Sequence, residues 1–427
     1  MALFEPNDIN FETAETNDPA TITQEELIAE EARIAEEAAI AEAVALASTL
    51  PENSLLVLEP DTSPAIAAAA AGALAAGAIL YINQGTPAEL AIAAARALPA
   101  FSRIQFHPET DLAVAAQTSR ELSDLSTVQL SPSTSAPLAQ VITASLRAYT
   151  GISLSSDIPQ QIAERAIRCM HASTFLRLSG NISQDLAKAA AAAMPINTVL
   201  APYPDTPLPI LEATIGSLQT GVTVNLGIGT NADLADTTAI HLPSGNYLEL
   251  HPNLGPEVFK ATAKSLGPGT GLIINSQTPP HSARAAVRNL FEEGITVIPN
   301  DNCPEQTLVA IAEELMEGSI LQLSAQLNLI TAANMAAKLD LGTILKLPAD
   351  ASEGFLNAVI PELSSGVVIE FLGSPPESSI QLALALKGTD VTLKLPKRHL
   401  PVSVLTEVGT NSPTSSPQKR TRMRYPR

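Results

Sequence analysis

One position of the sequence carries leucine or methionine at every 24th residue, and this period constrains the fold more than any other feature. The series is Leu50, Leu74, Leu98, Leu122, Leu146, Met170, Met194, Leu218, Leu242, Leu266 and Leu290. After one extra residue it continues at Leu315, Leu339 and Leu363. A constant period of this length indicates stacked structural repeats. Function is therefore expected at the positions that depart from the repeat.

Each repeat is predicted to hold one helix followed by one short strand. Large apolar residues stand eight and three positions before the period residue, as Ile162 and Ile167 do before Met170, which places them on one face of a helix. Six and eight positions after it come two more apolar residues, such as Leu176 and Leu178. This alternation is typical of a strand with one buried face.

The residues between these elements predict where the helices begin and end. Proline about ten residues before the period residue, as at Pro64 and Pro256, is expected in the first helical turn, where a missing N–H costs little. Glycines just before the strand are expected to end the helix with a positive φ; they are Gly77, Gly221, Gly245, Gly318, Gly342 and Gly366. Small polar residues after the strand are expected to bond the turn backbone or cap the next helix; they include Asp61, Asp157, Asn181, Asp205, Asn253, Gln277, Gln326 and Asp350.

Strand and turn together have the form L-x-L-x-x-N, most clearly in LPSGNYLELHPN from Leu242 to Asn253. This pattern resembles the leucine-rich repeat. With its alanine-rich helices it is similar to the LPxGTxLxLxxN repeat effectors of intracellular bacterial pathogens, over roughly residues 40 to 397. The resemblance implies an α/β solenoid (horseshoe) of about fifteen 24-residue helix–strand repeats. A parallel sheet would line the concave face, and the helices would lie on the convex face.

The sequence departs from that family in two respects. The asparagine is often replaced, so an unbroken asparagine ladder is not expected; the replacements include Gly85, Glu109, Ser133, Gly229 and Ser374. In the repeat after Leu290, Ile295 and Val297 stand one position early, and the following repeat gains a residue around Asn302 and Cys303. A local irregularity is expected there.

The ends of the chain differ from the repeats. Residues 1–23 are interpreted as a disordered acidic lead-in, and residues 24–50 as an acidic helix that caps the array, with partner binding as the alternative role. The solenoid is predicted over residues 51–398. Residues 399–427 are rich in Pro, Ser and Thr, are predicted to be flexible, and end in a basic cluster of Lys419, Arg420, Arg422, Arg424 and Arg427.

Composition narrows the classes of function. The net charge is −20, which argues against nucleic-acid binding by the body of the protein. The polar N-terminus lacks the pattern of a secretory signal, and no membrane span is expected. Cys169 and Cys303 lie in distant repeats and are predicted to be free, which fits a reducing compartment. That compartment is the bacterial cytoplasm or, by the resemblance, a host cell into which the protein is secreted.

The sequence contains no pattern that indicates catalysis, a metal site or a cofactor. The phosphate-loop-like run Gly227-Ile-Gly-Thr lacks a later glycine and a lysine, and is interpreted as a repeat turn. His107 and His251 occupy equivalent positions six repeats apart, roughly 28 Å at the spacing of stacked strands, too far to share a metal ion.

The outward strand positions, five, seven and nine residues after the period residue, are the candidate binding surface. They hold mixed polar and aromatic side chains, and tyrosine and arginine are frequent interface anchors. A protein partner with basic patches is expected to bind the concave sheet of a monomeric chain there. The candidate residues are Tyr81, Asn83, Gln105, His107, Gln129, Phe175, Arg177, Tyr203, Asn225, Tyr247, Glu249 and His251.

Two other hypotheses remain open at this point. One is an enzyme, or the recruiting arm of an enzyme, with a site around Arg177, Tyr203, Glu249 and His251, which would require these groups to converge in a pocket. The other is a structural array that associates with itself. The basic cluster at the end of the chain fits a nuclear-import signal, an anionic-surface patch or a solvated tail. By the resemblance, it also fits part of an export signal.

Overall fold

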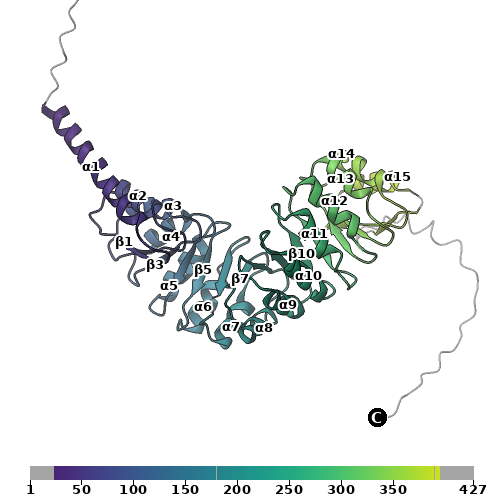
Figure 1. Ribbon diagram of the computed structural model, residues 1–427, viewed down its shortest axis with the longest axis horizontal. Coiled ribbons are helices and arrows are strands. Elements are labelled where there is room, and N and C mark those ends of the chain that lie inside the picture. Colours follow the sequence, from purple (N-terminus) through teal and green to yellow (C-terminus); the bar gives the residue numbers. More distant parts are fainter. Residues whose placement is uncertain (1–23, 179, 389, 395–427) are drawn as a thin grey trace, which may run out of the picture. The chain divides into compact units, whose positions relative to one another are not determined.

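The computed structural model describes residues 24–394 apart from residues 179 and 389. Within this part, helix and strand alternate along the chain, and the strands follow chain order from β1 to β15 in a parallel sheet (Figure 1). Paired residues are 24 positions apart in most repeats, as Thr223 and Tyr247 are. The predicted α/β repeat fold is confirmed. The predicted lead-in, residues 1–23, and the predicted tail with its basic cluster lie outside the described residues.

The chain divides into two compact units, residues 1–126 and 127–427, and the border falls inside the segment 51–398 that the sequence predicts as one array. The first unit contains α1 Gln24–Ser48, β1 Leu55–Val57, α2 Pro64–Gly72, β2 Ile79–Ile82, α3 Ala88–Ala97, β3 Arg103–Phe106 and α4 Leu112–Arg120. The second unit begins with β4 Thr127–Leu130, α5 Ala136–Ser145, β5 Gly151–Leu154, α6 Gln160–Ile167, β6 Phe175–Leu178, α7 Gln184–Ala193, β7 Val199–Pro202, α8 Leu208–Ile215 and β8 Thr223–Leu226. It continues with α9 Ala232–His241, β9 Tyr247–Leu250, α10 Pro256–Ser265, β10 Gly271–Ile274, α11 Pro280–Val287 and β11 Thr296–Pro299. Its last elements are α12 Glu305–Glu314, β12 Ile320–Gln322, α13 Leu329–Ala336, β13 Ile344–Pro348, α14 Glu353–Val359, η1 Ile360–Glu362, β14 Val368–Leu372, α15 Glu377–Leu386 and β15 Thr392–Lys394.

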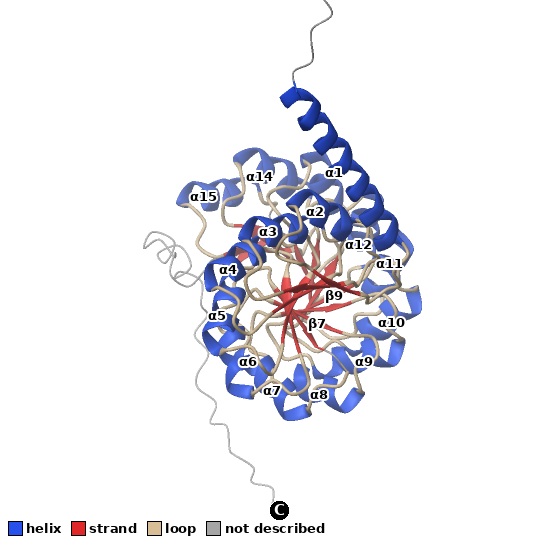
Figure 2. Ribbon diagram, turned by 90° about the vertical axis from the view of Figure 1, so that its left-hand side faces the viewer, coloured by secondary structure: helices blue, strands red, loops and turns tan. Residues whose placement is uncertain are grey.

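The core of each unit lies between its helices and one face of its strands. In residues 127–394 the described helices form one layer and the strands a second layer inside it (Figure 2). The two inward residues of a strand are fully buried, as Leu248 and Leu250 are in β9, while Glu249 between them is partly exposed. The period residues Leu266 and Leu290 are buried under the helices. The sheet face opposite the helices is therefore the open face, and it carries the candidate residues.

The acidic N-terminal helix, α1, is confirmed, but little of it packs. Residues 24–38 are exposed throughout, including Leu27 and Ile34, and Ala47 is the residue of α1 that is buried. The helix contacts α2. The contact of α1 with the array is therefore made mainly by its C-terminal half, and its role as a cap stays a prediction.

The helices begin differently from the prediction. Pro87, Pro159 and Pro207 occupy the N-cap, where φ near −60° and ψ near +130 to +140° suit proline, whereas Pro64 and Pro256 do lie in the first turn. Where the N-cap is polar, its side chain accepts a bond from the helix backbone; these residues are Ser63, Asp111, Ser135, Ser183, Asn231, Asn328 and Ser352. Four of them lie two positions after polar residues that the sequence suggested as caps; these four are Ser63, Ser183, Asn328 and Ser352.

The link from helix to strand contains a left-handed residue before each strand from β1 to β14. The predicted glycines all have φ between +81° and +90°, and Gly269 and Gly294 have φ of +77° and +78°. Six residues other than glycine adopt the same conformation: Asn53, Phe101, Leu125, Tyr149, Ser173 and Asn197. In residues 127–427 the N–H of each such residue donates to the carbonyl of its counterpart in the next repeat. This chain of backbone bonds runs from Tyr149 to Asp390, with N···O distances of 2.7–3.2 Å. The links therefore form a second ladder beside the sheet.

The irregular repeat is present, but the predicted position of the extra residue is wrong. Gly271 pairs with Thr296, 25 residues later, whereas Thr296 pairs with Ile320 at the usual 24. The extra residue therefore lies in the link between Leu290 and Gly294, before β11, and not around Cys303. Ile295 and Val297 are both buried, so the apolar alternation alone allowed two registers.

The turn after each strand departs from the leucine-rich pattern. The residues at the asparagine position, such as Asn181 and Asn253, are exposed. In most repeats the next residue is buried instead, and it is usually a threonine or an aliphatic residue, such as Thr230 and Leu254. The turns of the described repeats are therefore packed by this following side chain, without a buried asparagine ladder.

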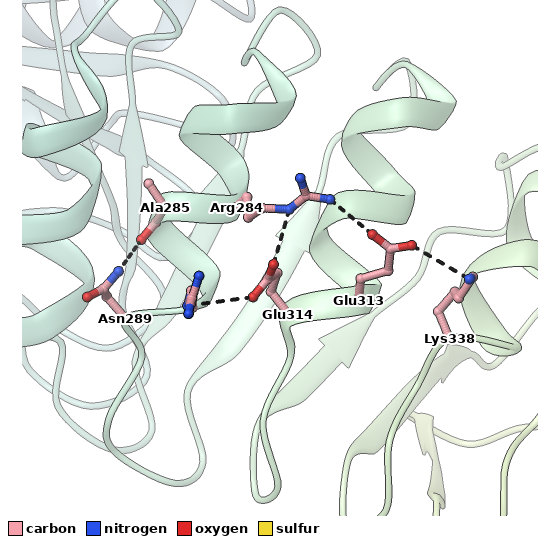
Figure 3. Close-up of polar contacts among 7 residues, drawn as sticks. Arg284, Ala285, Asn289, Glu313, Glu314 and Lys338 are labelled. Carbon is pink, nitrogen blue, oxygen red and sulfur yellow. Dashed lines mark hydrogen bonds and ion pairs between the residues drawn. The ribbon is translucent and has the colours of Figure 1, made fainter.

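Charged residues link α11, α12 and the residues just after α13, on both sides of the irregular link (Figure 3). Arg284 of α11 pairs with Glu313 at 3.0 Å and with Glu314 at 3.1 Å, both on α12, and Lys338 just after α13 lies 3.6 Å from Glu313. These side chains are partly exposed to solvent. Each pair is therefore worth less than about 1 kcal/mol.

Candidate functional site

The open face of the sheet carries all twelve residues that the sequence singled out in the strands. Phe175 is buried and the other eleven are partly exposed. Tyr81, Asn83, Gln105 and His107 belong to unit 1–126, and the remaining eight belong to unit 127–427.

In unit 1–126, half of the candidate residues are tied to the backbone. Tyr81 of β2 and Gln105 of β3 face each other in register. Asn83 donates from Nδ2 to the carbonyl of Leu58 at 3.4 Å, and Nδ1 of His107 accepts from the N–H of Glu109 at 3.2 Å. Asn83 and His107 therefore also shape the strand ends, and both remain partly exposed on the face.

In unit 127–427, Arg177 is held between two aromatic rings. Its Cζ lies 5.6 Å from the ring centroid of Phe175 and 5.3 Å from that of Tyr203, within the range of a cation–π interaction. The Phe175 ring lies over Gly151 of the adjacent strand, where a Cβ would approach the ring carbons to 2.6 Å. We call Phe175, Arg177 and Tyr203 the arginine cluster.

A buried serine lies beside this cluster. Ser153 on β5 is the register partner of Arg177 on β6. Only 7% of Ser153 is exposed, and among the described residues its hydroxyl has no hydrogen-bond partner. An unpaired buried hydroxyl costs free energy, so Ser153 is a candidate contact for a bound polar group. Nothing in the residue order distinguishes Ser153 from the other serines of the face.

Three strands further on, Glu249 is held by two amides. Asn225 of β8 donates to Oε2 at 2.9 Å, and Asn275, which follows β10, donates to Oε1 at 3.1 Å. The nearby ring of Tyr247 lies over Gly271, where a Cβ would come within 2.4 Å of Cδ1. We call Asn225, Glu249 and Asn275 the glutamate cluster. Asn275 stands at the ninth position of its repeat, at the end of the face that the sequence predicts, but is not one of the twelve candidate residues.

His251 serves the turn after β9. Its Nδ1 accepts from the N–H of Asn253 at 3.1 Å, as His107 does in its own repeat. Burial lowers the pKa of the His251 imidazole, although the negative charge of Glu249 opposes that shift. Because the accepting Nδ1 carries no proton, the ring is neutral in this arrangement.

The four residues of the enzyme hypothesis do not converge. Arg177 and Tyr203 meet, but Glu249 stands three strands from Arg177, about 14 Å at 4.7 Å per strand. His251 is engaged in its turn. A groove of about 380 Å³ lies on the other side of the unit, between α9 and α10, with Asp233 and Lys264 in its lining.

Metal-binding and membrane-spanning features are not found in the described part of the chain. Between residues 24 and 394, no three histidine, cysteine or acidic side chains gather closely enough to hold a metal ion. Over the same residues, no helix has the length and apolar character needed to cross a bilayer. Both cysteines, Cys169 and Cys303, are free.

Comparison with known proteins identifies no family for this chain. No protein-family model matches the sequence, and no curated protein matches it. The leucine-rich-repeat-like architecture therefore stands on the repeat unit and the sheet.

Proposed function

We propose that this protein is a non-enzymatic scaffold that binds a partner protein on the open face of its sheet between β5 and β10. The observation that carries the proposal is the arginine cluster. Arg177 lies between the rings of Phe175 and Tyr203 on a surface that no helix covers. Arginine and aromatic residues dominate the binding energy of protein interfaces.

The arginine cluster favours binding because the two rings order the side chain of Arg177 before a partner binds. An exposed arginine normally loses about 0.5–1.5 kcal/mol of rotamer freedom when a partner immobilises it. Two rings restrict Arg177 before any partner arrives, and Gly151 leaves the space that positions one of them. In the glutamate cluster, two amides restrict Glu249 in the same manner.

The non-enzymatic part of the proposal rests on the separation of the polar groups. An active site needs acid, base or nucleophile within hydrogen-bond reach of one reacting atom. Arg177 and Glu249 instead stand about 14 Å apart on a sheet. The enzyme alternative would regain support if a substrate were found to bridge them.

The chemistry of the partner has a long-range and a short-range part. The net charge of −20 favours attraction of a protein with basic patches, in line with the sequence-based prediction. The seventh positions of the strands in unit 127–427 are mixed, with Arg177, Lys346 and Lys394 against Glu249 and Glu370. The acidic excess therefore guides the approach of the partner, and the mixed face makes the contact.

The biological setting follows from the resemblance to bacterial effectors. We propose a chain that acts as a monomer in a reducing compartment, either the bacterial cytoplasm or a host cell into which it is secreted. Nuclear import through Lys419–Arg427 belongs to the same proposal. Light scattering tests the alternative of a self-associating array, which requires a mass that grows with concentration.

Affinity capture tests the binding function. Full-length wild type and a variant with Arg177, Tyr203 and Tyr247 changed to alanine are compared on host-cell and bacterial lysates, using quantitative mass spectrometry. The matched control replaces Lys346 and Glu370, which occupy the same strand position on β13 and β14. We expect the triple variant to lose the partner and the control to keep it. Identical catches from wild type and triple variant would remove the proposal.

A further inference from the structure

We infer that the open face of unit 127–427 recognises a pair of opposite charges in its partner, a carboxylate that binds Arg177 and a cation that binds Glu249. This inference rests on the proposed function, because it names the chemistry of the segment that the face binds. The partner segment must present the two charges about 14 Å apart, since β6 and β9 are three strand spacings apart.

The positive end of the site is shaped for an oxygen anion. The guanidinium of Arg177 is a planar fork of N–H donors that matches a carboxylate. The rings of Phe175 and Tyr203 hold that group, so a carboxylate meets it at its edge. The hydroxyl of Ser153 lies opposite in register and has no partner among the described residues. A bound carboxylate would satisfy this hydroxyl as well.

The negative end of the site is Glu249. Among the described residues, no lysine or arginine forms an ion pair with it. Glu249 accepts one hydrogen bond on each oxygen, from the neutral amides of Asn225 and Asn275. An ionised carboxylate has about four acceptor positions, so each oxygen keeps capacity for a cation. The neighbouring His251 has a lowered pKa and supplies no positive charge near pH 7.

The surface between the two ends is small and uncharged. The seventh positions of β7 and β8 are Ala201 and Asn225, and Ala201 is the smallest residue of this row between β6 and β10. A helix laid across the strands would span about 14 Å with nine residues, and an extended segment would need about four. The occupant is therefore a polypeptide segment with an acidic and a basic side chain at one of these spacings.

The test begins with a random library of 16-residue peptides displayed on phage and selected on the full-length chain. Enriched peptides are expected to share an acidic and a basic residue at a fixed spacing of about nine or about four positions. The same selection on Arg177→Ala should lose the acidic preference alone, and selection on Glu249→Gln should lose the basic preference alone.

Charge reversal in a synthesised peptide then fixes the pairing. We expect Arg177→Ala to weaken the binding of the selected peptide at least about ten-fold, the loss typical of a charge-assisted contact. Arg177→Glu should abolish binding, and replacing the acidic residue of the peptide with lysine should restore it. Lys346→Ala and Glu370→Gln are the matched controls, and both should leave the affinity unchanged.

Three results would decide against the inference. Enriched peptides without an acid–base pair, whose binding is still lost in Tyr203→Ala, would overturn the charge-pair reading and leave the binding face in place. Peptides that depend on Lys346 or Glu370 would move the site to β13 and β14. If no enriched peptide depends on any residue of the face, both the inference and the proposed function fail.

Discussion

Alanine at Gly151 is expected to destabilise unit 127–427 by about 3 kcal/mol or more. A Cβ at this position would lie 2.1 Å from the carbonyl oxygen of Phe175 and 2.6 Å from the nearest carbon of its ring. The oxygen belongs to β6, which is paired with both β5 and β7, so it has no independent way to move. Part of the sheet would have to shift, and the ring that supports Arg177 would shift with it.

Alanine at two other glycines of the same face provides a comparison for the expected loss of stability. At Gly271 the closest obstacle is Cδ1 of Tyr247 at 2.4 Å, which is part of a side chain that can rotate, so Gly271→Ala should cost about 1–2 kcal/mol. At Gly227 no atom lies within 4 Å, and Gly227→Ala should change stability by less than about 0.5 kcal/mol.

The three variants are compared by urea denaturation followed by far-UV circular dichroism. Hydrogen exchange with mass spectrometry localises the effect to the peptides that cover β5 and β6, because a repeat protein can open locally before it unfolds as a whole. Gly151→Ala must be the most damaging of the three. An effect no larger than that of Gly227→Ala would refute the claim that this glycine makes room for Phe175.

Four further outcomes follow from the fold. Ser173→Gly should raise the melting temperature, because glycine relieves a left-handed conformation that costs other residues about 1 kcal/mol; a lower melting temperature would contradict this. Burial raises the pKa of the Cys303 thiol to about 11, so iodoacetamide at pH 8 should label Cys169 first. The stability that Cys303 contributes is therefore complete below its unfolded pKa near 9.0 and is lost as the pH rises towards 11. Denaturation of wild type and Cys303→Ala at a series of pH values measures this loss. Arg284→Ala should cost less than about 1 kcal/mol and nothing measurable in 1 M salt, because its pairs with Glu313 and Glu314 are partly exposed; a larger, salt-independent loss would show that the side chain is needed for packing.

The elements that one repeat determines by itself could be predicted from the sequence. Alternation around Leu248 and Leu250 indicates a strand, and Gly245 before it indicates the left-handed link, because each signal depends on a few neighbouring residues. The extra residue near Leu290 could not be placed, since Ile295 and Val297 satisfied the alternation in two registers. Only pairing with Gly271 in the preceding repeat separates the two.

The site was predictable in part, for a similar reason. Strand positions alone placed Arg177 and Glu249 on the open face. Their partners come from adjacent repeats, and which side chains meet depends on rotamers and on the space that glycine leaves. The stacking of Arg177 on Tyr203 and the bond from Asn275 to Glu249 are contacts of this kind. The bond that His251 accepts from the turn backbone could not be predicted either, because it depends on the side-chain rotamer; a role of His251 in binding stays a prediction.

The backbone ladder along the helix-to-strand links has a consequence for how such a chain can change in length. Each link donates to the next at a spacing set by the repeat, so removal of 24 residues, from 224 to 247 for example, would rejoin the ladder with every N–H still opposite a carbonyl. A deletion of 12 residues would place helix against strand and break it. Around Leu290 the chain already carries one surplus residue within this link and continues in register. The links are thus where single residues can be gained or lost, and whole repeats are the unit in which the binding face can be lengthened or shortened.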